Sequence, residues 1–300
     1  MMFWGYGVAA YRRTPGARRP TPVDGVRAVV LWLALVAGAD LQAADLPPGI
    51  LLHFGFDDAG AGGSIADRSG HNHSGRAVGA KWTSVGKQGG GFEFTSTNNY
   101  IVVSNTPPLT PKQFSLALWF KTAKADAQRR WLLDKAADSG YALSLGGDAP
   151  DEQSRGKLCF AVNGHECWSD GRLADGVWHH GTATYDGERL QLYVDGQLQK
   201  QVTEWHGEPA ANGHDLTLGL NRSNPAPQEQ GLSFEGALDE VMIFSRALSG
   251  AEVQAVITAT RSRFTKDQVA RRVQEIKGLY DRGLLRKDFY ERKVQECETQ

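Results

Sequence analysis

The chain has 300 residues, with 33 Lys and Arg against 34 Asp and Glu, so its formal net charge is −1. A nearly neutral chain has no overall electrostatic field toward nucleic acid or an anionic membrane, so neither partner is expected. Glycine is frequent, at 35 residues, which favours a turn-rich β protein over a helical one.

Residues 1–44 are predicted to form a secretory signal peptide. Arginines are frequent before residue 28, and an apolar run of about ten residues follows at 28–37, which is typical of a signal peptide and short for a membrane span. Ala37 and Ala39 provide a small-residue cleavage pattern. The basic lead is unusually long, so an uncleaved N-terminal anchor is the alternative. Either way, the sequence predicts export to the periplasm, the cell surface or the medium.

Residues 45–258 are predicted to form one β domain. Short apolar or alternating runs follow one another, separated by turn formers such as Asp195-Gly196. In the run 189–194 three apolar residues share one face, which predicts a strand with one face on a core and the other toward water: Leu190, Leu192 and Val194. Many short strands at even spacing predict a sandwich or a barrel.

Three cysteines fit an exported protein. Cys159 and Cys167 flank an Asn-Gly turn signal, and a hairpin brings its two arms close together. A two-residue turn would place Phe160, not Cys159, opposite Cys167. We nevertheless predict a Cys159–Cys167 disulfide, formed across a wider loop or a bulge. Cys297 then either links two chains or stays free.

Residues 259–300 are predicted to form a helical hairpin. Ser249 and Glu252 have the spacing of a capping box at the start of a short preceding helix. Apolar residues then recur at helical spacing on both sides of Gly283, a good helix stop: Val269, Val273, Ile276 and Leu279, then Phe289 and Val294. Two helices this small bury little core by themselves. They are expected to pack on the β domain or on a second copy of the chain.

Three segments of the β domain carry a family pattern: FSLALWFK at 114–121, DGVWHHGTATYDGERLQLYVDG at 175–196 and FEGALDEVMIFSRALSGAEVQAV at 234–256. Together they resemble the laminin-G-like, concanavalin A-like jelly-roll domains, which implies an antiparallel jelly-roll β-sandwich. Gly181 stands where the family usually has an apolar residue, and this puts the local packing in question. The tail RRVQEIKGLYDRGLLRKDFYERKVQEC is similar to the bacterial short C-terminal domain, which implies protein contact or oligomerisation.

The resemblance also implies a calcium site. The family often links its opening loop to its closing strand through Ca²⁺, and the motif positions give four ligands: Asp57, Asp67, Asn72 and Asp239. Ca²⁺ takes about 6–8 oxygen ligands from carboxylates, carbonyls and water. The alternative is that Asp67 caps its own loop through an Asx turn.

No catalytic carboxylate run of the glucanase type occurs, so Asp239 and Glu240 are interpreted as structural and the protein as non-enzymatic. A glycoside hydrolase is expected only if folding brings distant carboxylates within ~5–9.5 Å of each other. Trp178, His179 and His180 stand together, but adjacent strand residues point to opposite faces, so the two histidines cannot bind one metal side by side. They are interpreted as scaffold, with Trp178 in the core and the histidines near the sheet surface.

Aromatic residues of the predicted loops suggest a carbohydrate ligand: Trp82, Trp168, Trp205 and Tyr100. Aromatic rings beside amides, such as the two asparagines before Tyr100, are typical of sugar sites. The predicted function is an exported recognition module for a glycan or, second, for a protein surface. The alternatives are an assembly protein whose tail mediates homo-oligomers and, less favoured, the glycoside hydrolase.

Overall fold

The computed structural model describes residues 46–58, 60–95, 98–125, 129–135, 139–146, 152–221, 233–261, 266–287, 289–291 and 294. All the described residues belong to the unit Ala44–Gln300. The predicted signal peptide and Cys297 lie outside the described residues. Within the described residues, no helix has both the length and the apolar character needed to cross a membrane.

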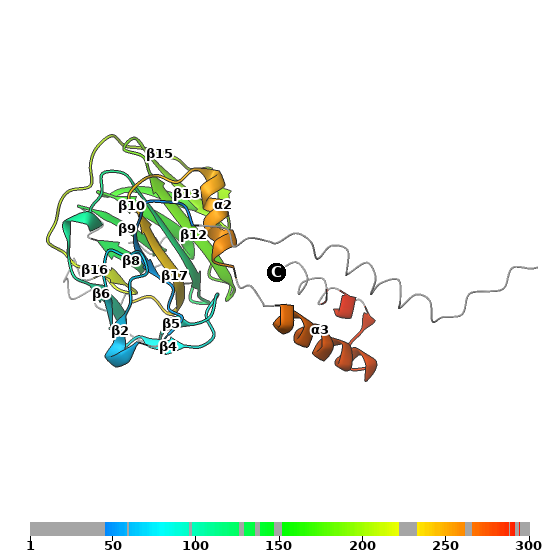
Figure 1. Ribbon diagram of the computed structural model, residues 1–300. Coiled ribbons are helices and arrows are strands. Elements are labelled where there is room, and N and C mark those ends of the chain that lie inside the picture. Colours follow the sequence, from blue (N-terminus) through cyan, green and yellow to red (C-terminus); the bar gives the residue numbers. More distant parts are fainter. Residues whose placement is uncertain are drawn as a thin grey trace, which may run out of the picture. The chain divides into compact units, whose positions relative to one another are not determined.

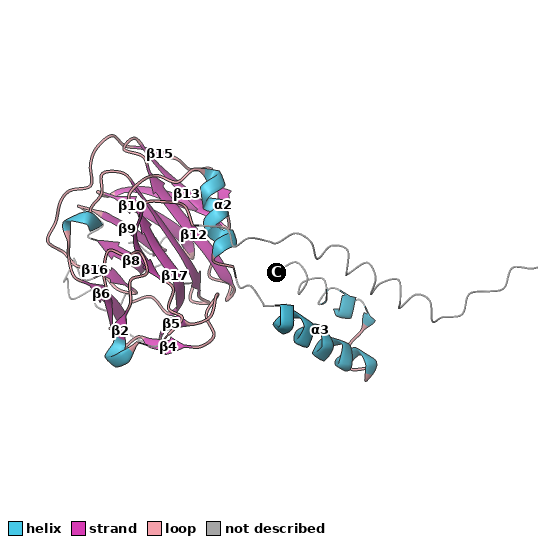
Figure 2. Cartoon of the chain, viewed as in Figure 1, coloured by secondary structure: helices cyan, strands magenta, loops and turns pink. Residues whose placement is uncertain are grey.

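Two antiparallel sheets form a sandwich, which confirms the predicted fold class (Figures 1 and 2). Sheet A contains β1 (Ile50–Phe54), β4 (Lys81–Thr83), β5 (Gly91–Phe94), β7 (Phe114–Lys121), β12 (Trp178–Tyr185), β13 (Arg189–Val194), β14 (Gln197–Leu198), β15 (Thr203–Glu204) and β17 (Gly236–Phe244). Its order is β14-β13-β12-β7-β17-β5-β4, with β1 paired to β17 and β15 to β13.

Sheet B has the order β11-β10-β9-β8-β16-β6-β3-β2. Its strands are β2 (Ser64–Ile65), β3 (Gly75–Val78), β6 (Tyr100–Val103), β8 (Arg130–Lys135), β9 (Tyr141–Leu145), β10 (Lys157–Val162), β11 (His165–Arg172) and β16 (Leu216–Leu218). Two short 3-10 turns, η1 (Ala61–Gly63) and η2 (Pro107–Leu109), lie in the connections. Several neighbouring strands are far apart in sequence, such as β7 with β17 and β6 with β16, as expected of a jelly roll.

The main core lies between the sheets, where side chains of alternate residues meet. In β13, Leu190, Leu192 and Val194 face this core, as the alternation predicted. Tyr193 lies on the opposite face, yet it is also buried, because helix α2 (Gly250–Ala259) covers it. The prediction of one face toward water is therefore wrong at this residue.

Helix α2 lies against the outer face of sheet A (Figure 1). Its predicted capping box is confirmed, because the Ser249 hydroxyl accepts the amide of Glu252 while the Glu252 carboxylate accepts the amide of Ser249. At the other end of the helix, Trp119 Nε1 donates to Thr260 Oγ1 over 2.8 Å inside the protein. Apolar residues of the sheet and the helix form a second core between these two ends: Ala117, Trp119, Met242, Phe244, Val253, Val256 and Ile257.

The predicted Cys159–Cys167 disulfide is wrong, since both cysteines are free and buried. In the β10–β11 hairpin Phe160 pairs with Cys167, and Cys159 pairs with Trp168. Paired residues share a face and neighbours along a strand alternate, so the two thiols lie on opposite faces of sheet B. The hairpin register that a two-residue turn requires therefore excludes the bond.

The tail contains helix α3 (Lys266–Asp281), and helical residues follow again at 287, 289–291 and 294. Gly283 ends α3 as predicted, with a φ of 72°. The amide of Leu284 donates to the carbonyl of Leu279, and that of Gly283 to the carbonyl of Tyr280. These two bonds form a Schellman motif.

Gly181, which departs from the family pattern, lies in β12 at the core. A Cβ at this position would lie 2.9 Å from Leu158 Cδ2. The glycine therefore leaves the space that Leu158 fills, and the departure is matched by local packing.

Candidate ligand-binding site

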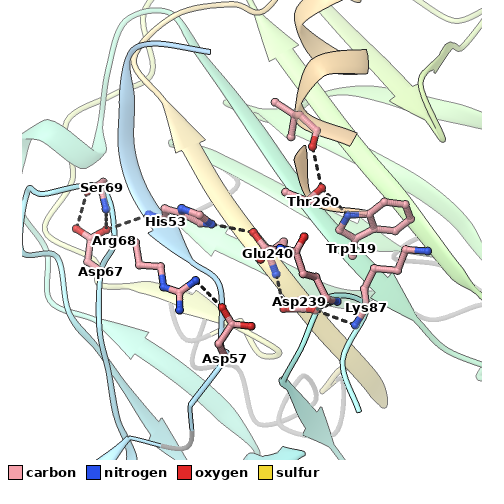
Figure 3. Close-up of polar contacts among 12 residues, drawn as sticks. His53, Asp57, Asp67, Arg68, Ser69, Lys87, Trp119, Asp239, Glu240 and Thr260 are labelled. Atoms are coloured by element: carbon pink, nitrogen blue, oxygen red, sulfur yellow. Dashed lines mark hydrogen bonds and ion pairs between the residues drawn. The ribbon is translucent and has the colours of Figure 1, made fainter. Parts of the chain in front are cut away.

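Asp67, one of the four predicted calcium ligands, binds donors of its own loop and of β1 (Figure 3). Its carboxylate accepts the amides of His53, Ser69 and His73 and the hydroxyl of Ser69, over 2.8–3.0 Å. Burial alone would raise the pKa of Asp67, but these hydrogen bonds lower it below its usual value. The Ser69 contact is the Asx turn considered above, so the loop-capping role of Asp67 is confirmed.

Asp57 and Asp239 both reach the loop between β4 and β5. Asp57 pairs with Arg68 over 2.6 Å and lies so close to Gly89 that a Cβ there would be 2.1 Å from its Oδ1. Asp239 Oδ2 accepts the amides of Lys87 and Gln88, each over 2.8 Å (Figure 3). The fold thus brings these two carboxylates to one loop, whereas Asp67 and Asn72 belong to another.

Asp239 and Glu240 form a buried acidic pair at a bulge in β17. Glu240 adopts a φ of 50° and its carboxylate lies 2.8 Å from His53 Nε2. Burial, together with the neighbouring Glu240 carboxylate, raises the pKa of Asp239 to about 8. Both acids therefore face partners inside the protein, which agrees with their structural interpretation.

Among the described residues, no group of three or more His, Cys, Asp or Glu side chains is arranged to hold a metal ion. Ca²⁺ also accepts backbone carbonyls and water as ligands, so carboxylate geometry alone does not decide its binding. Calcium binding by Asp57, Asp67, Asn72 and Asp239 stays a prediction.

Two of the predicted sugar-binding tryptophans make their contacts inside the protein. Trp82 Nε1 donates to the Phe56 carbonyl over 2.8 Å, and the ring packs on the main core. Trp205 stacks on His165 and on Tyr185, each with ring centroids 5.3 Å apart. Each ring is half-buried and already has aromatic or core neighbours.

The other two predicted residues, Trp168 and Tyr100, lie far apart on sheet B. Trp168 belongs to the edge strand β11, and four strands separate β11 from β6, which carries Tyr100. Five strand spacings correspond to about 24 Å. Trp168 lies near Trp131, and the Arg129 guanidinium packs over both rings. The four predicted aromatic residues therefore do not form one site.

A hollow of about 530 Å³ opens on the outer face of sheet A. This size suits a small-molecule or oligosaccharide ligand. Its lining comes from β5, β7, β17, the β4–β5 loop and the segment before β12: Val85, Glu93, Phe94, Thr95, Lys121, Thr122, Ala123, Gly176, Trp178, Gly236 and Ala237. Val85, at its rim, is 76% exposed.

One row of paired residues crosses the hollow. Trp178 of β12 pairs with Lys121 of β7, which also pairs with Ala237 of β17. Ala237 pairs in turn with Glu93 of β5. Paired residues of neighbouring strands share a face, so an aromatic ring, an ammonium group and a carboxylate line up over three strand spacings, about 14 Å. Within the described chain neither Lys121 nor Glu93 forms an ion pair.

The floor and one wall of the hollow are fixed by the backbone. A Cβ on Gly236 would lie 2.2 Å from the Lys121 carbonyl, so only glycine fits at this position of the floor. In the wall, the amide of Gly176 donates to the Thr122 carbonyl over 2.8 Å. The Thr122 hydroxyl donates in turn to the Glu235 carbonyl over 2.6 Å. Preformed parts of a site reduce the entropic cost of association.

The structure places Trp178 and His180 differently from the prediction made from the sequence. Trp178 is half-buried on the outer face, at the margin of the second core, and lines the hollow. His180 is 1% exposed and packs edge-on against Trp119, so its predicted place near the surface is wrong. Burial lowers the pKa of His180 to about 3, and its imidazole is neutral.

Comparison with known proteins agrees with this architecture. Residues 95–254 match the family described as the concanavalin A-like lectin/glucanases superfamily. A sequence search of curated proteins found no match. Among similar solved structures is domain 4 of AbnA, an extracellular arabinanase from Geobacillus stearothermophilus, in complex with arabinotriose. Its TM-score is 0.53 and its identity 18%, over 69% of this chain and 98% of that one.

Receptor-binding regions of botulinum neurotoxins are also similar. A structure of the type C neurotoxin, whose cell entry is described as dependent on interaction with two ganglioside molecules, has a TM-score of 0.54 and 13% identity over 71% of this chain. The serotype D binding domain has a TM-score of 0.51 and 17% identity over 69% of this chain. In each case the match spans 51% of the toxin chain. At these identities the likeness shows the fold.

Proposed function

The chain belongs to the concanavalin A-like lectin/glucanase superfamily, and from this premise we propose that it is an exported, non-catalytic module that binds carbohydrate in the hollow of sheet A. The observation that carries the proposal is the row Trp178, Lys121, Ala237 and Glu93. An indole beside small floor residues offers a sugar ring an apolar face to pack on. The ammonium and carboxylate groups offer a donor and an acceptor for its hydroxyls.

The similar structures add support at the level of ligand class. The AbnA domain was solved with arabinotriose, and the type C neurotoxin is described as interacting with gangliosides. The AbnA domain, which matches over 98% of its own length, is the more direct support, since the match spans 51% of the neurotoxin chain. Because function depends on the site and not on the frame, the ligand of this chain is argued from its hollow.

The composition of the hollow favours binding over hydrolysis. Glycoside hydrolases use two carboxylates that flank the scissile bond. Of the described residues that line the hollow, Glu93 alone carries a carboxylate. The buried pair Asp239 and Glu240 is 0% and 3% exposed, and its contacts are with the protein. These observations support the proposal of a non-catalytic module.

The test is a glycan-binding screen of the full chain that includes arabinotriose and ganglioside oligosaccharides, with and without Ca²⁺. Trp178→Ala removes the packing surface, and we expect it to weaken binding on the order of 10-fold, since aromatic residues dominate such contacts. Glu93→Gln and Lys121→Met should weaken it less, because both side chains are solvent-exposed.

Trp168→Phe is the matched control, since this half-exposed tryptophan lies on the other sheet. Its binding should equal that of the wild type. Loss of binding in Trp168→Phe with retention in Trp178→Ala would move the site to sheet B. No saturable binding to any glycan would overturn the proposal.

Assembly through the tail is the second candidate function. Tyr280 and Tyr290 stack with ring centroids 4.6 Å apart, which joins the two helical segments. Leu284, in the turn between them, is 64% exposed. Deleting residues after Arg261 and measuring the mass in solution tests this role. A monomer before and after deletion would exclude it.

A further inference from the structure

The imidazole of His179 lies between two carboxylates from different segments of the chain. Its Nδ1 is 2.8 Å from Asp195 Oδ2, in the turn between β13 and β14. Its Nε2 is 3.2 Å and 3.3 Å from the two oxygens of Asp175, in the segment before β12. The Phe120 ring of β7 packs against the imidazole with centroids 6.0 Å apart. His179 therefore connects these two segments.

Asp175 belongs to the segment that forms one wall of the hollow. The next residue, Gly176, and Trp178 both line the hollow. Asp175 Oδ1 also accepts the amide of Val177 over 3.1 Å, so the position of this carboxylate and that of the wall are connected. The Gly176–Thr122 bond and the pairing of Trp178 with Lys121 hold this segment on sheet A, and the His179–Asp175 contact adds a side-chain tie.

The imidazole of His179 can donate a hydrogen bond to both carboxylates only when it is protonated. A protonated imidazole has two N–H donors, one for each carboxylate, whereas a neutral imidazole has one donor and one lone pair. Asp195 is the closer partner, because its Oδ2 lies 2.8 Å from Nδ1 whereas the Asp175 oxygens lie 3.2 Å and 3.3 Å from Nε2, and its Oδ1 also accepts the amide of His180 over 2.8 Å. Deprotonation therefore leaves the donor on Nδ1 for Asp195 and turns a lone pair on Nε2 toward Asp175. The contact with Asp175 is the one that is lost.

The surrounding groups shift the pH at which His179 loses its proton upward. Hydrogen bonding to Asp195 is the main cause that raises the pKa of His179 above its usual value, against partial burial that lowers it, and Asp175 adds to the rise. Lys87 and His180 also act electrostatically on Asp195. Burial lowers the pKa of His180 to about 3, whereas that of His179 is raised, so the two histidines do not titrate together.

We propose that His179 is a protonation-dependent clasp that holds the Asp175–Trp178 wall of the hollow, so that the carbohydrate site is firm when His179 is charged and loosens when it is neutral. This inference rests on the proposed function, because it assigns pH regulation to the same hollow. A ligand that packs on Trp178 binds best to the firm wall, since less ordering is required on association.

Hydrogen–deuterium exchange of the full chain tests the clasp without any ligand. Exchange at residues 174–178 is followed from about pH 5 to 9 and corrected for its intrinsic pH dependence. Because the Asp175 carboxylate is half-exposed, we expect protection to fall about two- to five-fold as pH rises. In His179→Gln and Asp175→Asn, protection at acid pH should drop to the alkaline value and stay constant. His206→Gln changes an exposed histidine outside the hollow and should behave like the wild type.

Protection that is independent of pH in the wild type, or equally dependent on pH in His179→Gln, would overturn the clasp. Binding of the best glycan from the screen, measured at both ends of the pH range, separates this from the proposed function. If exchange in the wall depends on pH but no glycan binds, the clasp proposal stands and the proposed carbohydrate-binding function is refuted. Glycan binding at Trp178 with a wall that does not respond to pH would do the opposite.

Discussion

The hydrogen bond between Trp119 and Thr260 allows a near-isosteric test of how α2 is attached to sheet A. Thr260→Val keeps the shape of the side chain but removes the acceptor of Trp119 Nε1. The Thr260 hydroxyl also donates to the Val256 carbonyl, which keeps its backbone partner, the amide of Thr260. The one buried group that the substitution leaves without a partner is therefore the indole N–H.

An orphaned buried donor costs about 1–3 kcal/mol. Trp119 is 4% exposed and Thr260 2%, so water does not readily replace the lost acceptor and a value of about 2 kcal/mol is expected. For a domain of this size that corresponds to a decrease in Tm of about 4–8 °C. Urea unfolding and calorimetry measure both quantities.

Thr258→Val is the matched control for this experiment. The Thr258 hydroxyl donates to the Gln254 carbonyl in the same helix but is exposed to solvent. Its replacement should change the free energy of unfolding by less than about 0.5 kcal/mol. A double-mutant cycle with Trp119→Phe should give a coupling energy of about 1 kcal/mol or more. If Thr260→Val were as stable as Thr258→Val, the attachment of α2 through this bond would be refuted.

Three further predictions concern buried or acidic side chains. Folding raises the pKa of Asp239 from 3.8 to about 8, so the folded protein binds this proton more tightly than the unfolded chain and stability falls as pH rises through that window. Asp239→Asn should show a smaller fall between about pH 5 and 8 in urea midpoints, and an equal fall would contradict the assignment. Burial raises the pKa of Cys159 and that of Cys167, the latter to about 12, so iodoacetamide should label both only after unfolding and a reductant should leave Tm unchanged. If Asp57 and Asp239 bind Ca²⁺, added calcium should raise Tm and EDTA should lower it, whereas identical melting curves would exclude the site.

Local patterns in the sequence located several elements of the fold, whereas the choice of a jelly-roll sandwich over a barrel came from the family resemblance. Alternation located β13, the Ser249 capping box located α2, and Gly283 located the end of α3. The Asn163-Gly164 turn also contained the correct hairpin register, with Phe160 opposite Cys167. The disulfide prediction failed because it gave more weight to the oxidising compartment expected for an exported protein than to that register.

The binding site was less accessible from sequence, because contacts between distant residues decide it. Trp82 donates to a carbonyl 26 residues away, and Trp205 stacks on Tyr185. A position in a predicted loop therefore did not leave either ring free to bind a ligand. The hollow brings together Glu93, Lys121 and Trp178 through the pairing order of the strands in sheet A. A single sequence shows which face a residue takes, but not which strand will lie beside it.

The pairing of β1 with β17 has a mechanical consequence. Ile50 pairs with Phe244, and Leu46 packs in the same cluster as Ile257, so the chain enters and leaves the sandwich at neighbouring points. A tension applied between the segment before Leu46 and the segment after Thr260 would act on β1 and α2 and on β17 and β7, the strands that they contact. The strands of sheet B lie outside this path and would carry little of the load.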